Sequence, residues 1–194
     1  MAELNRCWLG FPLPRPLVEK IGEAQMQIRR RAGSDTIRWH PLGEVAVLLL
    51  SLGEIAPTTV LRVEGMMDQA LKGHGPINLS LEGVGGSPNI TMPKTAWVGI
   101  TGETEKLKAL RKDLANAVSQ LRTAIDEKEF EPVIEIGMLR KFDDRARTEM
   151  GRSIKMAGVG NLGAFTMDSV HVLASRASNA GPHLYSMKEH SLSS

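Results

Sequence analysis

The chain has 194 residues, of which 42% are hydrophobic, 24% are charged and only 4% are aromatic. This length suits one domain or two small lobes that share a core, and the composition is that of a soluble globular protein rather than of a disordered chain. The formal net charge is +2 and the only cysteine is Cys7, so the charge does not indicate a nucleic-acid-binding chain, and a disulfide or a cysteine-based zinc site within the chain is excluded.

Neither a targeting segment nor a membrane anchor is indicated. The first residues, MAELNRC, lack the basic start and apolar core of a signal peptide, and no apolar run is long enough to span a membrane. We therefore expect a soluble, cytoplasmic, monomeric protein. Because Cys7 lies in an apolar run, we expect it to be a buried structural thiol rather than a nucleophile.

Apolar residues at helical spacing predict helices over 14–32, 57–72 and 103–125. The third segment has the clearest pattern, because an apolar residue recurs every three or four positions from Leu107 to Ile125. Residues 142–163 are charged and contain several glycines, which predicts a short helix followed by a loop.

Shorter apolar runs between these helices predict β-strands. Segment 77–84 alternates apolar and polar residues, so we expect one buried and one exposed face, whereas 45–52 is almost entirely apolar, so we expect both of its faces to be covered. Residues 85–93 (GGSPNITMP) predict a turn-rich connector. The predicted strands are 5–11, 36–39, 45–52, 77–84, 94–100, 132–139, 166–175 and 183–188.

A weak internal repeat relates the two halves of the chain. Trp8-Leu9-Gly10 and Trp97-Val98-Gly99 each begin a predicted strand that is followed by a helix and a second strand. The repeat predicts one two-lobed α+β domain over 1–194, with a pseudo-two-fold relation between approximate halves 1–90 and 94–190. A cleft between the two lobes is the expected place for a ligand.

Five segments combine in an order and spacing that resemble one superfamily over nearly the whole chain. WLGFPLPRPLVEKI resembles its opening strand and proline-led helix, and KTAWVGITGETEKLKAL resembles its third-strand tryptophan and long helix. IRWHPLGEVAVLLLSLGEI and FEPVIEIGMLR resemble the two strands that carry its His-x-Thr-x motifs, and FTMDSVHVLASRASNAGPHLYSM resembles its last hairpin. The superfamily is that of the two-histidine (2H) phosphoesterases, in particular the RNA 2′,3′-cyclic phosphodiesterases, also called 2′-5′ RNA ligases. The resemblance implies antiparallel-rich sheets around a central cleft, with helices outside.

The resemblance also implies which groups catalysis would need. In this family one histidine deprotonates water, the other protonates the leaving ribose oxygen, and the two hydroxyls hold the phosphate. Position by position, the first motif has Ala46 in place of histidine and Leu48 in place of threonine, and the second has Val133 and Glu135. Since alanine and valine cannot transfer a proton, the resemblance implies the fold without the usual activity.

No other residue restores the missing pattern. None of the five histidines occurs in a His-x-Thr or His-x-Ser sequence, and His40 lies before the first motif strand. We expect His171 to be a surface or hydrogen-bonded strand histidine. The position often occupied by arginine after the second motif is Met138, and Arg140 lies two residues further. We expect no metal and no cofactor. We interpret the adjacent carboxylates Asp143-Asp144 as solvated turn residues.

Three hypotheses on function remain open. In the first, which we favour, the protein is a catalytically degenerate relative that binds RNA ends or nucleotides carrying a phosphate or cyclic phosphate, with Arg140, Lys141 and Arg145 as candidate phosphate-binding residues; a solvated basic surface is the simpler interpretation of these three. In the second, it is an active cyclic phosphodiesterase with rewired residues, such as Glu135 acting as a base with an arginine or histidine partner. In the third, it is a structural or interaction module whose cleft is closed by apolar side chains.

Overall fold

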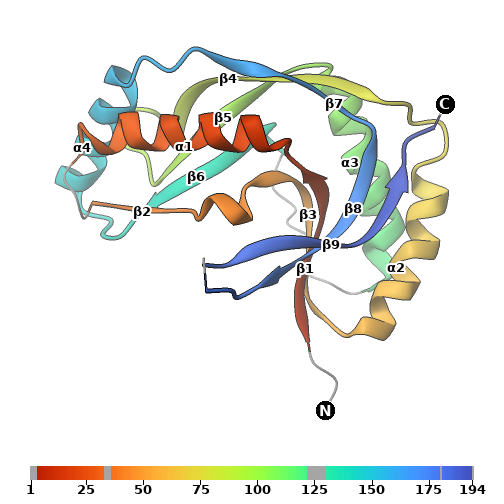
Figure 1. Ribbon diagram of the computed structural model, residues 1–194. Coiled ribbons are helices and arrows are strands. Elements are labelled where there is room, and N and C mark those ends of the chain that lie inside the picture. The colour runs from red at the N-terminus through yellow and green to blue at the C-terminus, as the bar shows by residue number, and fades with distance from the viewer. Residues whose placement is uncertain (1–3, 33–35, 122–129, 180, 194) are drawn as a thin grey trace.

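The computed structural model of the chain describes all residues except 1–3, 33–35, 122–129, 180 and 194 (Figure 1). Its strands form two antiparallel sheets. In spatial order, the four-stranded sheet contains β3 (Ala46–Ile55), β1 (Asn5–Pro12), β8 (Ser169–Arg176) and β9 (His183–Ser191). The five-stranded sheet contains β2 (Ile37–Trp39), β6 (Val133–Leu139), β5 (Thr95–Gly102), β4 (Ile77–Ser87) and β7 (Asn161–Met167).

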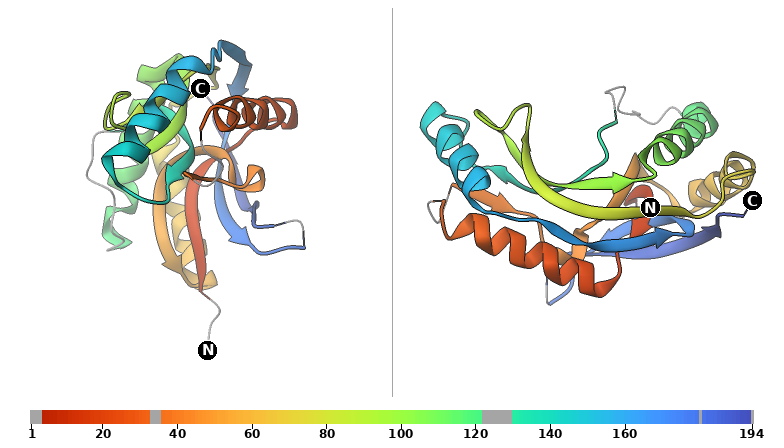
Figure 2. Two further views of the ribbon diagram at one scale, coloured as in Figure 1. Left: turned by 90° about the vertical axis from the view of Figure 1, so that its left-hand side faces the viewer. Right: turned by 90° about the horizontal axis from the view of Figure 1, so that it is seen from above.

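Two pairs of helices flank the sheets at opposite ends of the molecule (Figures 1 and 2). One pair, α2 (Pro57–Ala70) and α3 (Thr104–Val118), packs together, with α2 contacting β9 and α3 contacting β3 and β4. The other pair, α1 (Arg15–Arg29) and α4 (Asp144–Met156), contacts β6 of the five-stranded sheet. Short 3-10 turns cover Leu42–Glu44 and Ser119–Leu121.

The predicted α+β architecture with antiparallel sheets and outer helices is confirmed, and the helix boundaries follow local sequence signals. Proline occupies an early position in both α1 and α2, where its missing N–H leaves no intrahelical bond unmade. Helix α4 begins after Asp143, whose carboxylate accepts a hydrogen bond from the backbone N–H of Ala146. The part of the helix predicted over 103–125 that falls within 122–125 lies outside the described residues.

One strand prediction and one connector prediction are wrong in their boundaries. The single strand predicted over 166–175 is two strands, because β7 pairs with β4 in one sheet and β8 pairs with β1 in the other, and the chain changes sheet at Asp168. The connector predicted over 85–93 begins later than expected, since β4 continues to Ser87. The indole of Trp97 packs so closely on Gly85 that a Cβ atom there would lie 2.2 Å from its Cη2. Gly85 is therefore a strand residue of the β4–β5 pair, where a larger residue would clash with this ring, and not a turn glycine.

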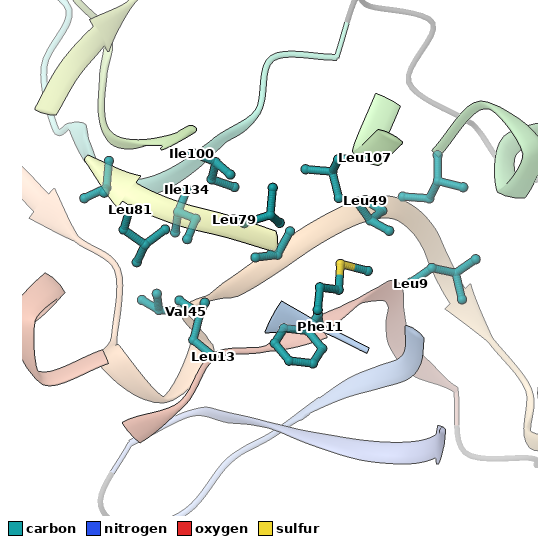
Figure 3. Close-up of a cluster of buried hydrophobic side chains, with 14 of the residues drawn as sticks. Leu9, Phe11, Leu13, Val45, Leu49, Leu79, Leu81, Ile100, Leu107 and Ile134 are labelled. Carbon is teal, nitrogen blue, oxygen red and sulfur yellow. The ribbon is translucent and has the colours of Figure 1, made fainter. Parts of the chain in front are cut away.

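The hydrophobic core joins the two sheets. Leu79, Leu81, Ile100 and Ile134 of the five-stranded sheet lie close to Phe11 and other side chains contributed by β1, β3 and their flanking segments (Figure 3). Cys7 is fully buried in this core, and burial raises the pKa of its thiol to about 11, so the predicted structural thiol is confirmed. No helix within the described ranges is both long enough and apolar enough to cross a membrane.

Candidate functional site

The two strands that resemble the catalytic strands belong to different sheets but contact each other. On β3, Ala46 is buried, whereas Leu48 is 37% exposed. The prediction that both faces of this segment are covered is therefore wrong at Leu48. β3 is the edge strand of its sheet, and its one neighbouring strand, β1, has Gly10 opposite Leu48, which offers no side chain to cover it.

A β-bulge in β6 places Met138 on the same face of the sheet as Val133 and Glu135 of the second motif. Thr95 and Trp97 of β5 share a face, and they lie opposite Met138 and Glu135 respectively, with the register shift between these two pairs. Val133, opposite Gly99, lies on the same face. We call this surface the motif face and define it by Val133, Glu135 and Met138 of β6, Thr95 and Trp97 of β5, and Arg38 and His40 of the β2 segment.

The β2 segment adds a cation and an imidazole to the motif face. Arg38 lies opposite Met138, and its Nη2 is 2.8 Å from the Met138 sulfur. Two residues on, Nε2 of His40 lies 2.8 Å from Oε1 of Glu135, and the two side chains are 30% and 46% exposed. As expected from the sequence, His40 lies before β3, the first motif strand. No local pattern in the sequence indicates its contact with Glu135, because that contact depends on the pairing of β2 with β6.

Backbone and side-chain contacts fix the β2 segment in this position. The Gln25 side-chain amide of α1 donates hydrogen bonds to the carbonyl oxygens of His40 and Ile136, at 2.9 and 3.0 Å. The backbone N–H of His40 also donates to the Ile136 carbonyl, at 3.0 Å. On the opposite face, the Trp39 ring packs on Gly137, where an added Cβ would lie 2.9 Å from Cε3 of Trp39. Because neighbouring strand residues alternate in direction, this packing directs Arg38 and His40 toward the motif face.

Trp97 contributes an aromatic surface beside Glu135. Its Nε1–H donates to Oγ of Ser87 at 3.0 Å, and its ring lies over Gly85. The residue is partly buried. An oriented, partly buried indole is a suitable surface for stacking a nucleobase.

The predicted basic residues Arg140, Lys141 and Arg145 are all exposed but do not lie at the motif positions. Arg140 follows β6, and its backbone N–H donates to the carbonyl of Thr36. It is five residues from Glu135, about 16 Å along an extended chain. Arg145 lies on α4, beside a hollow of about 450 Å³. The hollow is lined by Thr148 and by acidic and basic side chains, Asp144, Glu149, Arg145 and Arg152.

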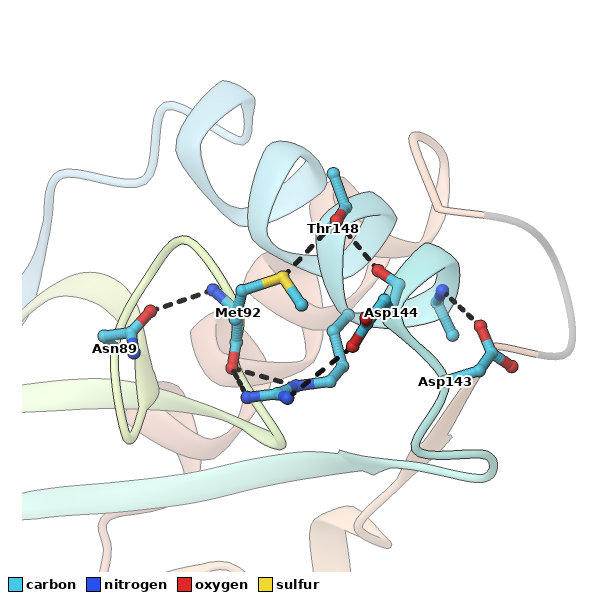
Figure 4. Close-up of polar contacts among 7 residues, drawn as sticks. Asn89, Met92, Asp143, Asp144 and Thr148 are labelled. Carbon is cyan, nitrogen blue, oxygen red and sulfur yellow. Dashed lines mark hydrogen bonds and ion pairs between the residues drawn. The ribbon is translucent and has the colours of Figure 1, made fainter.

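The contacts around α4 are those of a structural segment (Figure 4). Thr148 donates to the carbonyl of Asp144 at 2.8 Å and lies 3.4 Å from the sulfur of Met92. Arg147 donates from Nε and Nη2 to the Met92 carbonyl, which holds the connector against the helix. Asp143 and Asp144 are exposed, as expected, but they form the N-cap and the first residue of α4, so their interpretation as turn residues is wrong. Within the described part of the chain, no group of three or more metal-ligand side chains lies together.

His171 is hydrogen-bonded through both ring nitrogens. Nε2 lies 3.0 Å from Oγ of Ser169 and Nδ1 lies 2.8 Å from Oγ of Ser186. Burial lowers the pKa of this histidine from 6.5, although Glu189 and Asp168 act in the opposite direction, so it is neutral at pH 7. His171 is 7% exposed. It is therefore the hydrogen-bonded strand histidine that the sequence predicted, and it has no nitrogen available to a substrate.

Comparisons with known proteins agree on a fold. No protein-family model matches the chain. The chain is 23% identical to the RNA 2′,3′-cyclic phosphodiesterase of Aquifex aeolicus over 187 residues, an alignment that covers 95% of each protein. It is 29% identical to the RNA 2′,3′-cyclic phosphodiesterase of Archaeoglobus fulgidus over 106 residues, an alignment that covers 55% of the chain and 50% of that relative.

Solved structures superpose over almost the entire chain. The complex of E. coli LigT with 3′-AMP has a TM-score of 0.75 at 15% identity, covering 99% of the chain and all of LigT (100%). TT0787 of Thermus thermophilus has a TM-score of 0.72 at 20% identity, covering 96% of the chain and 97% of that protein. E. coli LigT complexed with phosphate has a TM-score of 0.69 at 15% identity, with 99% of both chains covered.

Proposed function

We propose that the chain, which resembles the two-histidine phosphoesterases in sequence and fold, binds nucleotides or RNA ends that carry a phosphate or cyclic phosphate, without the superfamily's two-histidine hydrolysis. The observation that carries this proposal is the composition of the motif positions. Ala46, Leu48 and Val133 offer only hydrocarbon, and positioned acid–base groups typically contribute about 10²–10⁴-fold to such reactions. Losing both histidines therefore removes the usual route of hydrolysis.

Three features of the motif face and its neighbouring strand support retained binding. Arg38 is exposed, Trp97 is only partly buried, and Leu48 on the neighbouring motif strand is 37% exposed. The exposure of Leu48, with Val133 only partly buried, speaks against the hypothesis that these two side chains close the site. E. coli LigT, which shares the fold, has been solved in complex with 3′-AMP, phosphate and ATP, and by extension we propose ligands of this chemistry here.

Calorimetric titration of the protein with 2′,3′-cyclic AMP, 3′-AMP and a short RNA ending in a cyclic phosphate tests this function. Each titration is run at two salt concentrations, because contacts with phosphate weaken as salt rises. We expect saturable, salt-sensitive binding and no hydrolysis of the cyclic ligands above background in a coupled assay. If none of the three ligands binds at either salt concentration, the proposed function is wrong.

A second candidate function rests on the contact between His40 and Glu135. A carboxylate that accepts the Nε2–H of a histidine leaves Nδ1 as the basic nitrogen, which can take a proton from water. The motif face as described contains no second histidine to protonate the leaving oxygen. We therefore place a rewired phosphodiesterase second. Hydrolysis of 2′,3′-cyclic AMP that disappears in both His40→Asn and Glu135→Gln would favour it over binding alone.

A further inference from the structure

The segment of the edge strand β2 places the side chains of Arg38 and His40 on the motif face. The adjacent strand β6 contributes no nitrogen-bearing side chain to this face. Arg38 and His40 share this face because they are two residues apart on an extended segment. We propose that Arg38 and His40 form the phosphate-binding site of this protein, with the nucleobase of the same ligand on Trp97. This inference rests on the proposed function and names the residues that would carry it out.

Arg38 is the better-placed anion ligand of the pair. Its guanidinium contacts the Met138 sulfur, which is a weak acceptor, and no carboxylate in the described ranges forms an ion pair with it. A guanidinium has five N–H donors in a planar fork that matches two phosphate oxygens. Most of these donors are therefore available to a ligand that approaches the exposed side of β2.

His40 completes the site and offsets the charge of Glu135. An unpaired carboxylate on this face would repel a phosphate, but Glu135 accepts a hydrogen bond from Nε2 of His40 at 2.8 Å. The Nε2–H that Glu135 accepts offsets part of the carboxylate's negative charge, and Nδ1 has no hydrogen-bond partner among the described residues, so it is open to a ligand. The ring of His40 therefore adds a polar contact to the site and screens Glu135 from the ligand.

The neighbouring strand β5 sets the kind of ligand. Thr95 lies opposite Met138, near Arg38, and Trp97 lies opposite Glu135, near His40. The two β5 residues are about 7 Å apart along the strand. A phosphate held by Arg38 and His40 thus has an aromatic ring within reach on the same face. The ligand class is a phosphorylated nucleoside or RNA terminus, in preference to inorganic phosphate.

Variants of the β2 residues test the site by calorimetry with 3′-AMP and with adenosine, which lacks the phosphate. We expect Arg38→Met and His40→Asn each to weaken 3′-AMP by about tenfold or more, the size expected for a charge-assisted hydrogen bond, and to leave adenosine within about twofold. Arg62→Ala is the matched control, because Arg62 is an exposed arginine on α2. It should leave 3′-AMP binding unchanged, and thermal unfolding confirms that all variants fold.

A double variant separates phosphate binding from a structural role of His40. In His40→Asn, Glu135 is left as an uncompensated carboxylate, so adding Glu135→Gln should recover several-fold of the lost 3′-AMP affinity. A purely structural role of the pair predicts no recovery. If the Arg38 and His40 variants bind 3′-AMP as tightly as the wild type, while Ala substitutions at Arg140, Lys141 and Arg145 abolish binding, the inference is wrong and the proposed function stands. If the wild type itself does not bind, the proposed function fails.

Discussion

Replacing Gly137 with alanine is expected to displace β2 without altering any side chain of the motif face. An added Cβ would lie 2.9 Å from Cε3 of Trp39 and 3.0 Å from Cγ2 of Ile37, whereas carbon atoms prefer about 3.5–4.0 Å. Both contacts involve stiff groups of β2, so the three-residue strand must move by several tenths of an ångström. Overpacking of this kind costs about 1–3 kcal/mol, which lowers the Tm of a chain of this size by about 2–12 °C.

The same displacement is expected to weaken nucleotide binding. Trp39 lies between Arg38 and His40, so moving its ring shifts both side chains relative to Glu135. Scanning fluorimetry measures the loss of stability, and calorimetry with 3′-AMP measures the loss of affinity, which we expect to be several-fold. Gly65→Ala is the control: Gly65 lies within α2, no atom beyond its chain neighbours and its own helix backbone lies within 4 Å of the added Cβ, and the change should stabilise the protein by about 0.5–1 kcal/mol. Wild-type Tm in Gly137→Ala would refute the packing argument, and a lowered Tm with unchanged affinity would refute the role of β2.

Three further predictions concern groups that hold the fold. Gln25→Ala removes the donor shared by the carbonyls of His40 and Ile136, and urea denaturation should show a loss of about 1–3 kcal/mol. Because burial raises the pKa of the Cys7 thiol to about 11, Cys7 should react with a disulfide reagent only after denaturation; rapid reaction in native buffer would contradict its burial. Because burial holds the pKa of His171 below 6.5, the unfolded chain binds more protons, so stability falls as pH drops below about 6.5; His171→Gln should flatten this decline in urea midpoints between pH 5 and pH 7.5.

Much of the fold could be predicted from the sequence, because local periodicity reports which side of an element is buried. The apolar stripe of α3 is buried at Leu107, Leu110, Leu114 and Val118, at the spacing that predicted the helix. The error at 166–175 has the opposite cause. Both β7 and β8 are extended strands, and the crossing between sheets at Asp168 leaves no local signal, since it depends on which distant strand each segment pairs with.

The candidate site could be predicted only in part. The four motif positions follow from the order of segments along the chain, and two of them, Val133 and Glu135, do share a face. The odd spacing between Glu135 and Met138 would place these residues on opposite faces of a regular strand, and only the bulge in β6 brings them together. Arg38 and His40 could not be assigned to this face at all, because the register of β2 against β6 is fixed by long-range contacts of Gln25 and Gly137.

Glu135 bears on function differently once its partner is known. Considered alone, a carboxylate at a phosphate-facing position argues against a phosphate ligand, because the two negative charges repel. Its contact with His40 changes the balance, since the ring N–H that the carboxylate accepts offsets part of its negative charge, and the other ring nitrogen is open to the ligand. Arg38, two residues before His40 on the same face, then supplies the net positive charge of the site. The residue that most weakened the case for a phosphate ligand is therefore compatible with one, provided that β2 stays paired with β6.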